Sequence, residues 1–348
     1  MTEAELTDPR PPALQGRDPV RAAVIGVGHF GRFHARKLAA SPDAVLACVY
    51  DTDPARAAAV ARECDTRAAA SLAEALSLAE AVSIAVPTRQ HATVATAALE
   101  AGRHVLIEKP ITETPAEAQA LIDLAERRER VLQVGHLIRF AAPIARLRAE
   151  VRQALYVECV RIAPWTSRGT DVNVILDLMI HDLDLVLSIV PAPIVDVDAV
   201  GTPVLSERED IANARLRFAD GCVATITASR VSMKTERKLR VFEADRYTSI
   251  DFGSRQVRRV RRTGAVSKGG IPDLDVSFDD FDDVDLLAAE LAAFLAAVRG
   301  ERPAEVTGRE GLRALQAATA VNDSLRRHAA FVAERTGLSP GASSRASA

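Results

Sequence analysis

The chain has 348 residues, of which 48% are hydrophobic, and its formal net charge is −3. This length suggests two domains, and the small net charge provides no general attraction for nucleic acid or for a membrane surface. The four cysteines form no closely spaced pair, which argues against a disulfide framework or a zinc ribbon and favours a reducing compartment. Since neither a signal peptide nor an apolar run of about 18 residues is visible, a cytoplasmic location is expected.

Both ends of the chain are predicted to be disordered, because residues 1–19 are acidic and rich in proline and residues 333–348 are rich in small polar residues. Residues 20–142 alternate strand and helix patterns. Strands are predicted from short apolar runs at 21–27, 44–50, 81–86, 104–108 and 131–135. This alternation predicts an α/β domain with a Rossmann doubly wound parallel sheet, covered by helices on both faces.

A glycine-rich turn follows the first predicted strand. Gly26, Gly28 and Gly31 form the pattern G-x-G-x-x-G, and Asp51 ends the second strand, 20 residues after Gly31. In this context the glycines allow a tight turn and a close approach of the backbone to a pyrophosphate at a helix N-terminus. Asp51 would accept hydrogen bonds from the adenosine ribose and repel a 2′-phosphate. NAD is therefore expected rather than NADP, although Arg56 nearby weakens that preference.

The predicted helix at 171–190 is apolar nearly all round, yet it carries Asn173, Asp177, His181 and Asp184 on one stripe. Because a buried carboxylate without a partner is costly, the stripe should either pair internally or face a wet, functional cleft. One interpretation makes His181 a core histidine bonded to one of the two aspartates. No set of further histidines accompanies His181 in a metal-binding pattern, so no metal site is expected.

The second half of the chain has a different pattern. Consecutive strands with short turns predict an α+β domain over 143–332 with a large, mostly antiparallel open sheet, followed by helices near 284–299 and 308–332. One face of such a sheet packs on helices, and the other is expected to form the interface of a homodimer or homotetramer. The arginine-rich segment 255–262 is interpreted as a charged edge strand, neutralised by the acidic run at 273–285, rather than as a nucleic-acid site.

Several segments together carry a resemblance to a known family. They are Val86-Pro87-Thr88 with His91, the signature Glu108-Lys109-Pro110, and a D-x-x-x-H helix at Asp177 and His181. With them, the chain from Arg21 to about residue 328 resembles the Gfo/Idh/MocA oxidoreductases. Together, the resemblance and the glycine turn predict a set of cofactor-binding residues: Gly26, Gly28, His29, Phe30, Gly31, Asp51, Pro87, Thr88, His91 and Glu108.

The resemblance implies that Lys109 lies beside the nicotinamide and that Asp177 and His181 lie across the substrate as further catalytic residues. Oxidation of a secondary alcohol needs a base for the hydroxyl proton, and a histidine can serve near neutral pH. Asp177 could orient the ring of His181 and stabilise the imidazolium. Lys109 could stabilise the developing alkoxide, or it could itself be the base, so the division of labour between Lys109 and His181 stays open.

The segment around the D-x-x-x-H helix looks like that of the nucleotide-sugar 3-dehydrogenase subgroup. This resemblance implies oxidation of the 3-hydroxyl of UDP-N-acetylglucosamine or a related nucleotide sugar, a step that feeds lipid A synthesis in some bacteria. The alternatives are a dehydrogenase of a free polyol or sugar such as inositol and, in another class, a non-catalytic NAD-binding sensor. Candidate substrate-binding residues are His136, Arg168, Asn173 and Arg230.

Overall fold

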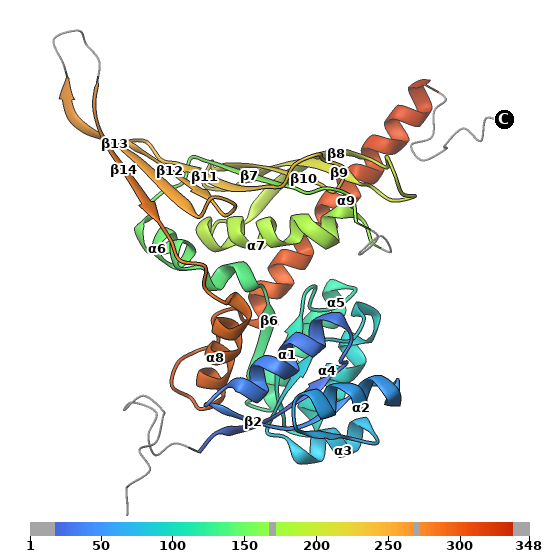
Figure 1. Ribbon diagram of the computed structural model, residues 1–348. Helices are drawn as coiled ribbons and strands as arrows, with labels where there is room; N and C mark the ends of the chain where they lie inside the picture. The colour runs from blue at the N-terminus through green and yellow to red at the C-terminus, as the bar shows by residue number, and fades with distance from the viewer. Residues whose placement is uncertain (1–17, 167–171, 267–271, 337–348) are drawn as a thin grey trace, which may run out of the picture. The chain divides into compact units, whose positions relative to one another are not determined.

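The computed structural model describes residues 18–166, 172–266 and 272–336, and the chain divides into two compact units (Figure 1). The first unit runs up to Leu137 and includes Asp285–Gly311, and the second comprises Ile138–Val284 and the chain from Leu312 onward. Residues 285–311 thus belong to the first unit and not to the predicted domain 143–332. The predicted disordered segments lie largely outside the described residues, except that residues 333–336 are helical.

The first unit is built on a six-stranded parallel sheet with the strand order β3-β2-β1-β4-β5-β6. The strands are β1 (Val20–Ile25), β2 (Ala44–Tyr50), β3 (Arg67–Ala68), β4 (Ala81–Ile84), β5 (His104–Glu108) and β6 (Leu132–Gly135). β1 and β4 are apolar and almost entirely buried, as expected for strands covered on both faces. The predicted doubly wound sheet is confirmed.

Helices pack on both faces of this sheet (Figure 1). They are α1 (His29–Ala40), α2 (Pro54–Glu63), α3 (Leu72–Leu78), α4 (His91–Glu100), α5 (Pro115–Arg127), α8 (Leu286–Val298) and the short 3-10 helix η2 (Thr88–Gln90). Their starts are encoded locally: Asp53 caps α2, and Thr114 forms a capping box with Glu117 at α5. In α8, Phe294 and Leu295 join the core around β1, which is why this helix belongs to the first unit although it is distant in sequence.

The second unit is built on an eight-stranded sheet with the order β14-β13-β12-β11-β7-β10-β9-β8. All neighbouring strands are antiparallel except β7 and β10. The strands are β7 (Tyr156–Ile162), β8 (Ile194–Thr202), β9 (Ile211–Phe218), β10 (Val223–Ser229), β11 (Glu236–Phe242), β12 (Arg246–Asp251), β13 (Gln256–Val266) and β14 (Pro272–Asp280). The predicted, mostly antiparallel sheet is therefore confirmed.

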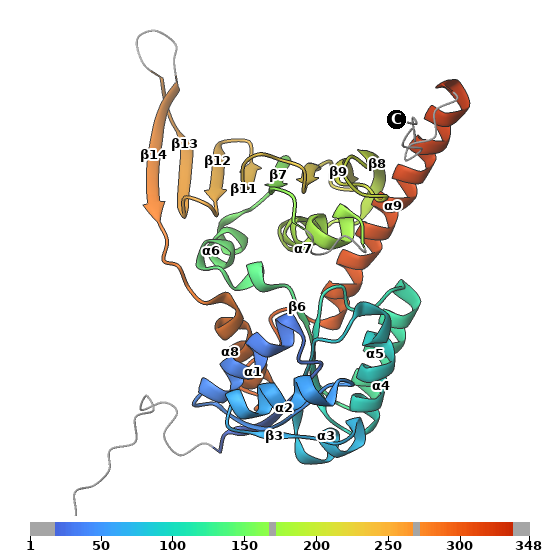
Figure 2. The same ribbon diagram turned by 45° about the vertical axis from the view of Figure 1, so that its right-hand side comes forward.

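Helices of the second unit lie against one face of this sheet, as Figure 2 shows for α6 and α7. They are the 3-10 helix η3 (Leu137–Phe140), α6 (Ala142–Glu150), the π-helix η4 (Ile175–Met179), α7 (Ile180–Ile189) and α9 (Gly308–Thr336). Arg161 of β7 faces α7, where it binds Asp182. Because strand residues alternate between faces, Tyr156 of β7 and its register partner Phe242 point to the opposite face.

The arginine-rich segment lies in β13, which pairs with β12 on one side and β14 on the other. Its interpretation as an edge strand is therefore wrong, because the acidic run forms β14 outside it. The expected neutralisation is confirmed: Arg261 binds Asp275 at 3.0 Å, and Arg259 also forms an ion pair with Asp279. A sequence pattern identifies the two strands but not which of them is outermost.

Candidate active site

Four segments of the first unit leave the same edge of its sheet. β1, β4, β5 and β6 end just before the glycine turn, Val86-Pro87-Thr88, Lys109 and His136, respectively. Because these strands are parallel, their carboxyl ends share one edge. The strand order reverses between β1 and β4, and in open α/β sheets ligands bind outside the carboxyl ends at such a reversal.

The three glycines of the turn serve different purposes. A Cβ on Gly26 would lie 2.7 Å from Val86 Cγ1, at a φ of +83°, and a Cβ on Gly31 would lie 1.8 Å from the backbone oxygen of Gly26. The chain's own packing thus requires both of these glycines. A Cβ on Gly28, in contrast, would have no heavy atom of the described residues within 4 Å. Gly28 also precedes α1 without a side-chain cap, so the open space lies at the N-terminus of this helix, a position that suits a pyrophosphate.

Asp51 fastens the end of β2 to the glycine turn. The N–H of Val27 donates to Asp51 Oδ2 at 2.9 Å, and Arg56 forms an ion pair with the same carboxylate at 3.2 Å. The carboxylate is therefore held beside the turn, as a ribose-binding role requires. The ribose contact itself stays a prediction. His29 and Phe30 begin α1 with exposed side chains whose rings meet edge to face at 5.5 Å, and their cofactor contacts also stay predictions.

His91 is buried, and its two ring nitrogens lie between two strand ends. Nε2 is 2.9 Å from the carbonyl oxygen of Val86, and Nδ1 is 2.9 Å from that of Pro110. Burial lowers the pKa of the imidazole, which favours the neutral ring. His91 therefore joins the turn after β4 to the Lys109-Pro110 segment after β5, where the peptide bond is cis. Pro87 and Thr88 lie in the turn between Val86 and His91.

Glu108 points toward the interior of the first unit. Its Oε1 is 3.0 Å from Nε2 of His34, whose Nδ1 is 2.7 Å from the hydroxyl of Ser83. From the sequence alone, His34 had no predicted role. The available signal was its spacing, since Gly31, His34, Ala35 and Leu38 make up the buried face of α1. A histidine on an inward-facing stripe beside the glycine turn needs a partner, and Glu108 supplies one.

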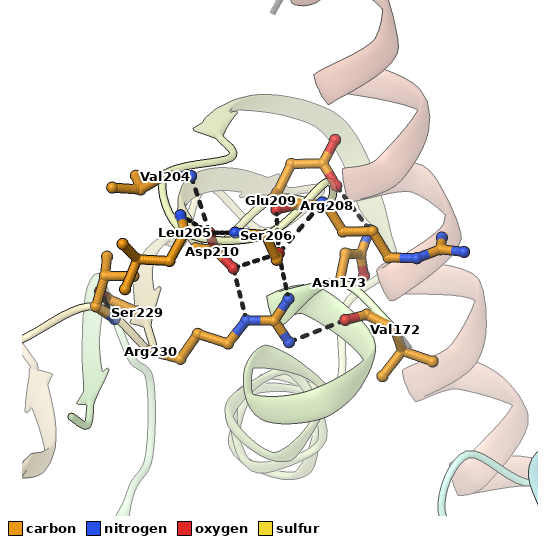
Figure 3. Close-up of polar contacts among 11 residues, drawn as sticks. Val172, Asn173, Val204, Leu205, Ser206, Arg208, Glu209, Asp210, Ser229 and Arg230 are labelled. Carbon is orange, nitrogen blue, oxygen red and sulfur yellow. Dashed lines mark hydrogen bonds and ion pairs between the residues drawn. The ribbon is translucent and has the colours of Figure 1, made fainter. Parts of the chain in front are cut away.

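In the second unit, Asn173 holds the beginning of the helix that carries Asp177 (Figure 3). Its Oδ1 accepts a hydrogen bond from the N–H of Leu176 at 3.3 Å, as an N-cap side chain does. Its amide donates to Asn322 Oδ1 at 2.7 Å and to Glu209 Oε2 at 3.3 Å. Asn173 thus links three segments of the second unit, and its contact with substrate stays a prediction.

Arg230 is buried beside the same helix start. Its guanidinium donates to Asp210 at 2.8 Å and to the carbonyl oxygen of Val172 at 2.9 Å (Figure 3). Burial opposes the negative charge of Asp210, but hydrogen bonds from Ser206, from backbone N–H groups and from Arg230 hold the pKa of the carboxyl well below its usual value. The observed partners of Arg230 are structural, and its predicted contact with substrate is untested.

The polar stripe of this helix separates into two sets. Asp182 and Asp184 are buried and bind Arg161 at 2.7 Å and Arg139 at 3.1 Å, respectively. Asp177 and His181 are only half-buried, on the side away from the apolar core positions of the helix. Asp177 lies in the π-helical turn, and such turns occur frequently at functional sites. The charge of Asp184 is thus balanced by Arg139.

Each unit brings its own predicted residues together. The first contains the glycine turn, Lys109 and the buried His136, and the second contains Asp177 and His181 on one helix. Arg168 lies outside the described residues.

Comparison with known families agrees with this division. Residues 20–136 match the model of the oxidoreductase family with an NAD-binding Rossmann fold, and residues 143–245 match the GFO/IDH/MocA C-terminal domain. The chain belongs to the Gfo/Idh/MocA oxidoreductase family. The expected family and NAD as the cofactor are thereby confirmed, and the open space at Gly28 fits that cofactor.

Individual family members cover most of the chain. UDP-N-acetylglucosamine 3-dehydrogenase of Acidithiobacillus ferrooxidans is 44% identical over 303 residues, covering 87% of this chain and 96% of the relative. A solved structure of that enzyme superposes with a TM-score of 0.84 at 43% identity, covering 89% of this chain and 99% of the other. A scyllo-inositol 2-dehydrogenase of Bacillus subtilis is 27% identical, covering 88% of this chain and 94% of the relative.

Proposed function

We propose that this protein oxidises the 3-hydroxyl of UDP-N-acetylglucosamine, or of a closely related nucleotide sugar, and transfers the hydride to NAD. The observation that carries the proposal is the 44% identity with UDP-N-acetylglucosamine 3-dehydrogenase along nearly the whole length of that enzyme. The inositol dehydrogenases are more distant, at 27% for the Bacillus subtilis relative.

Different residues of the chain have different roles in this reaction. Bound NAD supplies the hydride acceptor, and the Gly26–Gly31 turn with the N-terminus of α1 would hold its pyrophosphate. His181 accepts the hydroxyl proton, and Asp177, one turn earlier, stabilises the imidazolium. Lys109 donates to the reacting oxygen and stabilises its developing charge. The reverse assignment, with Lys109 as the base, uses the same residues.

One cation of the second unit is suited to an anionic substrate. Arg237 is exposed and lies on the helix-facing side of β11, in register with Arg161 of β7. Arg161 already binds Asp182, and within the described ranges the guanidinium of Arg237 forms no hydrogen bond or ion pair. Burial and the neighbouring Arg161 lower the pKa of Arg237, so an added negative charge would be favourable there. A diphosphate supplies that charge, whereas inositol is neutral.

Turnover measurements test the substrate directly. NADH absorbance is followed with UDP-N-acetylglucosamine, free N-acetylglucosamine and myo-inositol, and we expect turnover with the nucleotide sugar. Lys109→Ala should reduce kcat by at least about 100-fold, the loss typical of removing a group that stabilises developing charge. The control Lys37→Ala, which alters a half-exposed lysine of α1 paired with Asp285, should retain activity. Turnover with inositol alone would support a polyol dehydrogenase, and NAD binding without any turnover would support a sensor.

The sheet face opposite α6 and α7 is proposed to bind a second copy of the chain. Tyr156, Phe242 and Tyr247 form a row of contacting rings on neighbouring strands there, with centroid distances of 5.5 and 4.7 Å. Half-buried aromatic side chains in a continuous row are typical of the core of a protein interface. Phe242→Glu should convert the oligomer to monomers in light scattering, and an unchanged mass would contradict this assignment.

A cytoplasmic location and a place in lipid A synthesis are also proposed. All four cysteines are free thiols, which suits a reducing compartment. Within the described ranges, no helix has both the length and the apolar content needed to cross a bilayer. The product of the proposed reaction, a ketone on carbon 3 of the sugar, is a substrate for amination, the kind of step that diamino-sugar synthesis requires.

A further inference from the structure

A chain of buried and partly buried polar groups runs through the first unit to the residue before Lys109. Ser83 of β4, His34 of α1 and Glu108 of β5 are joined by contacts of 2.7 Å and 3.0 Å. His34 and Ser83 are 1% and 2% exposed. These three residues come from different elements, so the contacts depend on the folded sheet and not on local sequence.

Glu108 connects this chain to the backbone of Lys109. The N–H of Lys109 donates to Glu108 Oε2 at 3.3 Å, while Oε1 faces His34. Gly135 of β6 leaves room beside the carboxylate, because a Cβ there would lie in tight contact, 3.2 Å from Glu108 Cδ. The Glu108 carboxylate is therefore held on three sides, with the main chain of Lys109 attached to it.

A second buried carboxyl, Glu290 of α8, lies near Glu108 but has a different environment. Glu290 is fully buried, and neither of its oxygens has a hydrogen-bond partner among the described residues. Burial, with a smaller contribution from Glu108, raises the pKa of Glu290 well above its usual value. Burial also disfavours the charge of Glu108, but His34 and Lys109 outweigh it and lower the pKa of that carboxyl. Glu108 is therefore the charged member of the two and Glu290 the neutral one.

We propose that Glu108 and His34 are positioning residues for Lys109, holding its main chain in place and keeping a negative charge beside its ammonium group. This inference rests on the proposed function, in which Lys109 binds the reacting oxygen. The titratable groups that face Glu108 are His34 from α1, Lys109 from its own segment and Glu290 from α8. Because Glu290 is neutral, Glu108 carries the negative charge of this group of residues.

The test compares Glu108→Gln with the wild-type enzyme over a range of pH. Glutamine keeps the size of the side chain but removes its charge, so Lys109 loses its proton more easily. We expect kcat to fall by about 100-fold, the cost of a small displacement of a reacting group. In the plot of kcat against pH, the change in kcat on the alkaline side should move to lower pH, while the Kd for NAD changes little. Glu80→Gln, which alters an exposed acid paired with Arg21, is the matched control and should leave the profile unchanged.

His34→Gln provides a second route to the same result if Glu108→Gln does not fold. It should move the change in kcat on the alkaline side in the same direction, because a displaced Glu108 no longer holds its charge beside Lys109. A folded variant at either position with the wild-type profile would overturn the inference, as would a loss of kcat that merely follows weaker NAD binding. Two results separate the proposals: no turnover of a nucleotide sugar by the wild-type enzyme would remove the proposed function, whereas an inactive Lys109→Ala beside an unaltered Glu108→Gln would remove only this inference.

Discussion

The two units hold their functional residues by different physical means. In the first unit, the backbone geometry positions the functional residues. Gly26 and Gly31 leave no room for a side chain, and the functional segments follow parallel strands. In the second unit, long-range side-chain contacts hold the helix of Asp177 and His181, through Asn173 and the Asp210–Arg230 pair. A backbone conformation that requires glycine can be recognised as a sequence motif. A side-chain contact between residues distant in sequence leaves no such motif.

The largest effect should come from the glycine turn. In Gly31→Ala the new Cβ would overlap the backbone oxygen of Gly26, so the turn must move, and we expect a loss of about 4 kcal/mol in the stability of the first unit. Gly28→Ala meets open space and should retain stability but lose NAD binding. Hydrogen exchange of β1 and NADH titration measure the two effects. Equal stability of the two variants would contradict the assignment of Gly31 to the packing of the turn and of Gly28 to the space for the cofactor.

A slightly smaller effect is expected at the side-chain contacts of the second unit. Asp210→Asn leaves the buried Arg230 without its counter-charge, which should cost about 3 kcal/mol. Trp165 is the only tryptophan and lies in this unit, so its fluorescence in urea reports the loss. Because the pKa of Asp210 is lowered by folding, its contribution is present above the unfolded pKa and is lost as pH falls below it. The variant and the wild type should therefore converge in stability toward acid, and a constant difference at all pH values would contradict this account.

Glu290→Gln should stabilise the first unit. The pKa of Glu290 is raised by folding, so the wild type loses stability as pH rises above the unfolded pKa, and glutamine removes that loss. We expect a gain near neutral pH of about 1.4 kcal/mol for each unit by which folding raises the pKa, shrinking toward acid. The control Glu126→Gln alters an exposed carboxyl paired with Arg309 and should show no such gain. Destabilisation of Glu290→Gln at neutral pH would show that the carboxyl has a partner.

The smallest effect is expected at a local helix start. Asp53 accepts hydrogen bonds from the N–H groups of Ala55 and Arg56, and Asp53→Ala should cost about 1 kcal/mol in hydrogen-exchange stability of α2. Asp53→Asn preserves the cap and should recover most of the loss. If both variants lost the same amount, the charge of Asp53 rather than its capping would be responsible.

Much of the fold follows from local patterns in the sequence. The strand runs and the glycine turn each depend on residues close together in the chain, and both match the structure. The assignment of α8 to the first unit and the position of β14 outside β13 depend on distant contacts, so the sequence misses both. The same reason explains why the stripe of residues 173–184 could not be divided in advance, since Arg139 and Arg161 are its distant partners.

The central claim, hydride transfer from carbon 3 of a nucleotide sugar to NAD, can be tested by isotope transfer. UDP-N-acetylglucosamine carrying deuterium at carbon 3 of the sugar is incubated with the enzyme and NAD, and the nicotinamide product is examined by mass spectrometry. The account predicts NADH that carries the deuterium, and no labelled NADH with Lys109→Ala. Unlabelled NADH from the wild-type enzyme would show that another position is oxidised, and no NADH with any nucleotide sugar would contradict the proposed function.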